Sequence, residues 1–263
     1  MDREDFEKIV QNPNMISGIH NYCDRWCERC PMTSRCSVFA TTESENADNQ
    51  HSDTDNEAFW NYLHEMFSLT LEMAEEWAIK NGVDIDAPPS EDEVALQEQI
   101  DSQTECHIIM TAARTYRMQT HEWFIANEKV FKQKTEQVRQ AYDLELPAAD
   151  PEAELWELSD IVDVILWYHT LILAKLHRAV HQVVERELTD SEDYSGDSDG
   201  SAKVAMLSID RSLTAWAVLR NHLPEQEGII LDFLVRLERL RRQTERLFPN
   251  ARAFIRPGLD ERR

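Results

Sequence analysis

Four of the five cysteines in this chain of 263 residues lie within the stretch YCDRWCERCPMTSRC, residues 22–36. Thiolates are strong ligands both for structural zinc and for iron–sulfur clusters, and both kinds of centre can take four sulfur ligands. Because the chain has only one further cysteine, Cys106, the clustering of the other four predicts a metal centre in this stretch. We call the four residues, which follow the spacing C-x3-C-x2-C-x5-C, the cysteine cluster: Cys23, Cys27, Cys30 and Cys36.

The spacing leaves the identity of the metal open. Iron–sulfur clusters often take a compact run of cysteines from one segment, sometimes with a proline after one of them, and Pro31 directly follows Cys30. Structural zinc usually uses two separated C-x2-C knuckles, and only one is present. We predict an iron–sulfur cluster first and zinc second, with free thiols or a redox disulfide as a third reading. His20 is placed to replace one thiol, although a surface loop histidine is the simpler interpretation.

A short helix over residues 16–28 would bring the first three cysteines of the cluster together, because they are spaced i, i+4 and i+7. Pro31 would end that helix, and the following loop would return the fourth cysteine to the same face. Nearby cations stabilise thiolates and would offset the negative charge of the centre. Three arginines are interleaved with the cysteines: Arg25, Arg29 and Arg35.

Most of the remaining sequence has apolar residues at helical spacing, and glycine is scarce. We therefore predict an all-α protein, an antiparallel bundle of about four long helices with a small cysteine-rich N-terminal helical lobe. The predicted helical segments cover residues 57–81, residues 91–143 with a break near 101–104, residues 151–188, and residues 201–248 with a break at Pro224 and Gly228.

The predicted domains follow from these segments. We expect a metal-binding lobe at 1–40, a disordered acidic linker at 41–56, the bundle at 57–248, and a tail that packs on the bundle at 249–263. Five residues are predicted to lie in the core of the bundle: Cys106, Trp123, Trp156, Trp167 and Trp216.

The net charge of −23 is strongly acidic, which disfavours nucleic acid as a partner. Residues 236–263 are an exception, with nine arginines against four acids. We expect most of these arginines to pair with acids of the bundle, and a docking surface for an acidic protein partner is the alternative. The most apolar stretch, residues 161–174, is too short to span a membrane. Without a visible secretory signal, a cytoplasmic protein is expected, where clustered cysteines more often bind metal than form disulfides.

A second candidate site consists of three charged residues in the last two long segments: Lys175, Arg178 and Asp210. Buried charges must be paired, so we expect a structural ionic network here, with a cofactor- or ligand-binding polar pocket as the alternative. Motifs for nucleotide binding, serine hydrolysis and zinc proteolysis are absent from the sequence, so catalysis stays open. Three functions are compatible with these features: a metal- or cluster-binding protein with a structural, redox-sensing or electron-transfer role, a helical-bundle enzyme, and a scaffold with structural zinc.

Overall fold

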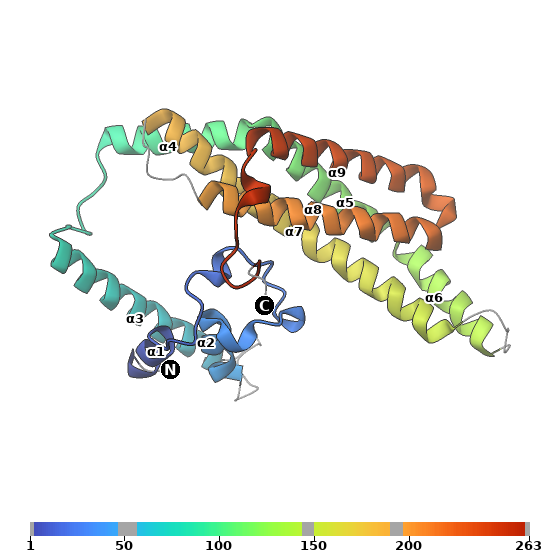
Figure 1. Cartoon of the computed structure of the whole chain (residues 1–263), viewed down its shortest axis with the longest axis horizontal. Helices are drawn as coiled ribbons and strands as arrows, with labels where there is room; N and C mark the ends of the chain where they lie inside the picture. The colour runs from blue at the N-terminus through green and yellow to red at the C-terminus, as the bar shows by residue number, and fades with distance from the viewer. Residues whose placement is uncertain (1–2, 47–56, 144–149, 190–196, 261–263) are drawn as a thin grey trace. The chain divides into compact units, whose positions relative to one another are not determined.

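The computed structural model describes residues 3–46, 57–143, 150–189 and 197–260. These residues form α-helices and short 3-10 turns, without a β-strand among them (Figure 1). The prediction of an all-α protein is therefore confirmed. Within the described residues, no helix has the length and apolar character needed to cross a membrane.

Contacts divide the chain into two compact units. The first contains Met1–Ala95 together with Ile255–Arg263, and the second contains Leu96–Phe254. The first unit thus includes both the cysteine cluster and residues 57–81, which we assigned to the bundle. The predicted domain bounds stay a prediction, because a division by contacts does not test which segments fold independently.

Among its described residues, the first unit includes α1 (Arg3–Val10), α2 (Ser37–Asn46), α3 (Glu57–Asn81) and the start of α4 (Glu91–Cys106). The Arg3 guanidinium joins α1 to α3 through a bidentate pair with Glu76, in which both N–O distances are 2.6 Å. Helix α2 includes the first six residues of the segment predicted as a disordered linker. The rest of that segment, residues 47–56, lies outside the described residues.

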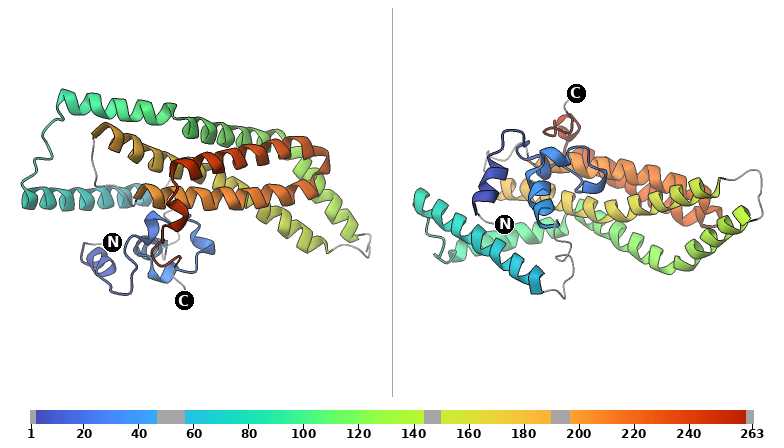
Figure 2. Two further views of the ribbon diagram at one scale, coloured as in Figure 1. Left: turned by 45° about the horizontal axis from the view of Figure 1, so that its top comes forward. Right: turned by 90° about the horizontal axis from the view of Figure 1, so that it is seen from below.

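The second unit is an antiparallel bundle of long helices (Figures 1 and 2). Arg178 in the C-terminal half of α7 pairs with Asp197 at the start of α8, whereas His222 at the end of α8 pairs with Glu157 near the start of α7. The two helices therefore run in opposite directions, as predicted. Four helices pack together: α5 (Ile108–Ala126), α7 (Pro151–Thr189), α8 (Asp197–His222) and α9 (Glu227–Leu247).

The predicted segment 91–143 forms three helices: α4 (Glu91–Cys106), α5 and α6 (Glu128–Asp143). The first break lies at His107, slightly later than predicted, where the backbone is extended and Nδ1 accepts a hydrogen bond from the Ile109 N–H at 3.2 Å. The second break, at Asn127, was not predicted. There, both the backbone N–H and the side-chain amide of Asn127 donate to the Trp123 carbonyl, which ends α5.

Aromatic side chains from α5, α8 and α9 meet at the centre of the bundle. The Trp216 ring is fully buried and stacks on Phe233, with 4.4 Å between ring centroids. The Trp216 indole N–H donates to the Tyr116 hydroxyl at 3.0 Å, and Trp123 packs edge-on against the Trp216 ring. Burial raises the pKa of Tyr116 to about 12, so this hydroxyl stays protonated at neutral pH.

The core prediction is therefore correct for two tryptophans, Trp123 and Trp216. It is wrong for Trp156, which is 75% exposed, and for Trp167, which is 36% exposed. Cys106 is also exposed, because it is the last residue of α4 and directly precedes the break. Helical spacing places these residues on a face but does not show which face another helix covers.

His169 in α7 is a polar residue of this core, with 8% of its surface exposed. Its Nδ1 lies 2.5 Å from the Leu166 carbonyl, and its ring stacks on His121. Burial is the main cause that lowers the pKa of His169, and the charges of Arg117 and His121 lower it further.

We predict that His169 makes the bundle less stable in acid. Because the pKa of His169 is lower in the folded chain than its ordinary value of 6.5, the unfolded chain binds this proton more readily. Stability is therefore lost as the pH falls through 6.5 towards the pKa of the folded state. Urea unfolding at pH 7.5 and pH 5.5 should show a larger loss of unfolding free energy for wild type than for His169→Gln. Equal losses in the two proteins would contradict this account.

Candidate metal centre

The backbone around the cysteine cluster differs from the predicted helix over residues 16–28. Three short 3-10 turns occupy this region: η1 (Ile19–Asn21), η2 (Cys27–Arg29) and η3 (Thr33–Arg35). Two residues have left-handed backbone conformations that interrupt an α-helix, Gly18 with φ of 71° and Arg25 with φ of 58°. The predicted arrangement of three cysteines on one helical face is therefore wrong.

The turns nevertheless bring the four cysteines together. All four line one small cavity with a volume of about 20 Å³. This is room for about one water molecule. His20 also lines the cavity, together with apolar side chains that include Ile19 and Phe39. The convergence that we predicted is thus present, although 3-10 turns produce it.

Backbone N–H groups hold two of the sulfur atoms. The Arg25 N–H lies 3.4 Å from the Cys23 sulfur, and the Met32 N–H lies 3.4 Å from the Cys30 sulfur. In both cases the donor is two residues after the cysteine. These N–H groups fix the positions of the two sulfur atoms, and the Cys23 thiol donates in turn to the His20 carbonyl at 3.5 Å.

The thiols also influence one another. Burial raises the pKa of Cys27, and the neighbouring Cys23, Cys30 and Cys36 raise it further, because adjacent thiolates repel. A bound cation would remove this repulsion. Within the described residues, no three His, Cys, Asp or Glu side chains are already arranged to hold a metal ion. Metal binding at the cluster therefore requires the thiol side chains to rotate toward a common centre.

The interleaved arginines have different surroundings. Arg25 lines the cavity. The Arg29 guanidinium lies 3.7 Å from the centre of the Trp26 ring, and Arg35 donates to the Asn14 carbonyl at 3.1 Å. Two of the three arginines thus have contacts that stabilise the turns, and Arg25 is the one beside the cysteines.

The second candidate site is divided between two places in the bundle. Arg178 donates to Asp197 and not to Asp210. The two aspartates are 13 residues apart in α8, which is about 20 Å along a helix. Asp210 instead accepts from Arg252 at 2.7 Å and from Arg241 at 3.5 Å. A cofactor-binding role for Lys175, Arg178 and Asp210 stays a prediction.

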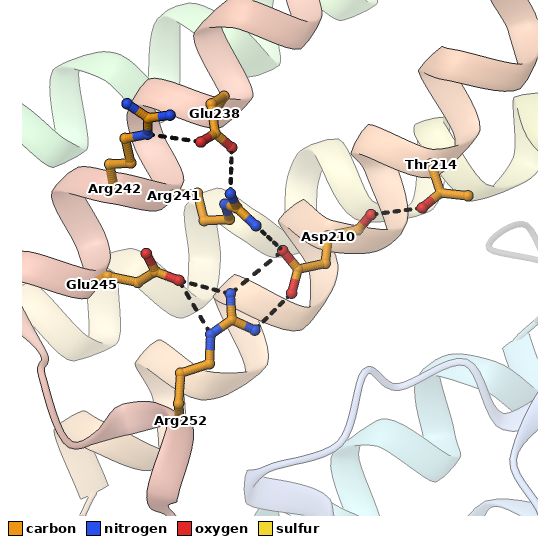
Figure 3. Close-up of polar contacts among 7 residues, drawn as sticks. All are labelled: Asp210, Thr214, Glu238, Arg241, Arg242, Glu245 and Arg252. Carbon is orange, nitrogen blue, oxygen red and sulfur yellow. Dashed lines mark hydrogen bonds and ion pairs between the residues drawn. The ribbon is translucent and has the colours of Figure 1, made fainter.

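Asp210 belongs to an ionic network that joins α8, α9 and η5 (Ala251–Ala253), as Figure 3 shows. Glu245 pairs with Arg252 at 2.9 Å, and Glu238 pairs with both Arg241 and Arg242 at 2.7 Å. Ala251, beside Arg252, is fully buried, so the network covers the place where η5 packs on α8. We expected these arginines to pair with acids of the bundle, but the sequence did not indicate which acids.

We predict that Asp210→Asn lowers the unfolding free energy by about 1 kcal/mol, because two partly exposed ion pairs are weakened together. Asp232→Asn is the matched control, since Asp232 is an exposed residue of α9 that makes no ion pair among the described residues. It should change stability by less than about 0.5 kcal/mol. Urea unfolding at low salt measures both. An Asp210 variant as stable as the control would show that the network contributes nothing to stability.

Comparisons with protein-family models, with curated proteins and with solved structures find no match for this chain.

Proposed function

We propose that the cysteine cluster binds one metal ion through its four sulfur atoms, and that this ion stabilises the N-terminal lobe. The observation that carries the proposal is that all four cysteines line the same cavity. Separated cysteines or two distant pairs would instead favour disulfides or unrelated thiols. The two backbone N–H groups directed at Cys23 and Cys30 support the same conclusion.

A single ion requires the smaller rearrangement of the site. The thiols need only rotate toward a common centre to hold one ion, whereas a cluster of several iron and sulfide atoms needs more room between them. Zn²⁺ is the ion of choice, because it accepts four thiolates in a tetrahedron and has no redox chemistry of its own. This reverses the order of the two metals that the cysteine spacing favoured.

A structural role follows from the small apolar core of this lobe. Ile19 and Met32 are the buried hydrophobic residues among residues 12–36. Three 3-10 turns with so little apolar burial gain little stability from packing, and small domains of this kind commonly depend on a metal. The free energy of metal binding would then be part of the free energy of folding.

We predict one equivalent of zinc per chain in protein purified under anaerobic, reducing conditions, with no visible absorption. Replacement by Co²⁺ should give the absorption bands of tetrahedral thiolate ligation. Elemental analysis and the ultraviolet–visible spectrum measure both. Detection of iron and sulfide, together with broad visible absorption, would show that the site binds an iron–sulfur cluster and not a single ion. Failure to retain any metal after reconstitution would refute the proposal.

Single-cysteine variants test which sulfur atoms are ligands. Cys27→Ser and Cys30→Ser should each lower the metal affinity by at least about tenfold, because one thiolate ligand is lost. Cys106→Ser is the matched control, since this cysteine is exposed and lies in α4. It should leave the metal content unchanged. If all three variants retain metal equally, the ion is bound elsewhere.

A second candidate function is the docking of an acidic protein partner on α9. Three exposed arginines of this helix make no hydrogen bond or ion pair with other described residues: Arg236, Arg239 and Arg246. Unlike the arginines of the Asp210 network, these side chains are available to a partner. In a chain with a net charge of −23, these three side chains give α9 exposed positive charge that can attract acidic segments.

We predict that a synthetic polyglutamate peptide binds this surface at low salt, and that Arg239→Glu with Arg246→Glu weakens binding by about tenfold or more. The control is Lys129→Glu with Lys132→Glu, the same charge change on the exposed face of α6. Fluorescence anisotropy of a labelled peptide measures the affinities. Equal weakening by both double variants would show that only the net charge matters.

A further inference from the structure

Residues 255–260 lie in the same compact unit as the cysteine cluster, although more than 200 residues separate them in sequence. They form a turn in which the N–H groups of Leu259 and Asp260 donate to the Arg256 carbonyl at 3.1 and 3.2 Å. The Asp260 carboxylate accepts from both the backbone N–H and the guanidinium of Arg256. The turn is thus closed by its own hydrogen bonds.

Gly258 brings this turn close to Ile16 and Ile19 of the N-terminal lobe. Its φ of +68° is rarely adopted by other residues. A Cβ atom at this position would overlap Ile16 Cδ1, and it would lie 3.3 Å from Ile16 Cγ2 and 3.4 Å from Ile19 Cδ1. The close approach of the turn to the two isoleucines therefore requires glycine.

Both isoleucines are connected to the cysteine cavity. Ile19 is 2% exposed, and it lines the cavity while also lying beside Gly258. The Ile16 N–H donates to the Arg35 carbonyl at 2.9 Å, directly before Cys36. The turn around Gly258 thus packs against Ile19, which lines the cavity, and against Ile16, which is hydrogen-bonded to the residue before Cys36.

We propose that docking of residues 255–260 closes the cysteine cavity from behind Ile19, so that the docked turn and the occupied cavity stabilise each other. The expected effect of the docked turn on metal binding rests on the proposed function, whereas its expected effect on the exposure of the thiols does not. Because the coupling is an equilibrium property, it acts in both directions. Loss of the docked turn loosens the thiols, and removal of the metal loosens the turn.

Two glycine variants separate docking from backbone strain. Gly258→Ala introduces both an unfavourable φ and the overlap with Ile16. Gly82 has the same φ of +68°, but a Cβ atom there would meet nothing within 4 Å. Gly82→Ala is therefore a control for strain alone. A rescue variant combines Gly258→Ala with Ile16→Ala, which removes the two Ile16 atoms that the new methyl group would approach.

Hydrogen exchange over residues 255–260 reports docking, because the three hydrogen-bonded backbone N–H groups of this short turn exchange by local opening, which packing on Ile16 and Ile19 opposes. The reaction rate of the thiols with a disulfide reagent, and the rate of zinc loss to a chelator, report the state of the cavity. Both rates should rise by about fivefold or more in Gly258→Ala relative to Gly82→Ala, and the rescue variant should reverse part of the rise. Zinc removal from wild type should speed exchange in residues 255–260.

The readouts distinguish the two proposals. If wild type binds no metal, the proposed function fails, and the thiol reaction rate in metal-free protein still decides the coupling. If Gly258→Ala speeds exchange in the turn but leaves the thiol reaction and zinc loss unchanged, the coupling is overturned. Equal rates in Gly258→Ala and Gly82→Ala for all readouts overturn it as well, because the overlap with Ile16 would then have no effect.

Discussion

The packing of α7 against three neighbouring helices organises the second unit. Helices α5, α6 and α8 all pack on α7. Helix α8 contributes small residues to the core, since Ser201, Ala202 and Ala205 are fully buried. Side chains of this size allow two helix axes to lie near each other and leave little room for an alternative register. The aromatic centre around Trp216 and the Asp210 network both lie on α8, so both depend on this packing.

Much of the bundle could be predicted, because long amphipathic helices have a clear period in sequence. The break at Pro224 follows from a residue that cannot continue a helix. The exposure of Trp156 could not be predicted, because periodicity identifies an apolar face but not the presence of a neighbour. The pairing of Asp210 with Arg252 is equally hidden, because it joins residues 42 positions apart.

The region of the cysteine cluster was harder to predict for a different reason. A 3-10 turn of three residues has no periodic signature, and the left-handed conformation of Arg25 is unusual for a residue with a side chain. The spacing predicted that the four cysteines come together, and all four line one cavity, although no three of the described ligating side chains are arranged to hold a metal ion. It did not indicate how the backbone achieves this, and it gave no sign that Gly258 takes part.

The discontinuous composition of the first unit has a consequence for synthesis. The surface formed by Ile16 and Ile19 stays uncovered until residue 258 has left the ribosome. At about 5–20 residues per second, this follows Cys36 by roughly 10–45 s. During that interval the whole of the second unit is made, and the cysteines are present without the turn that packs behind them. The cysteines are thus synthesised long before the turn that packs against Ile16 and Ile19 in the same unit.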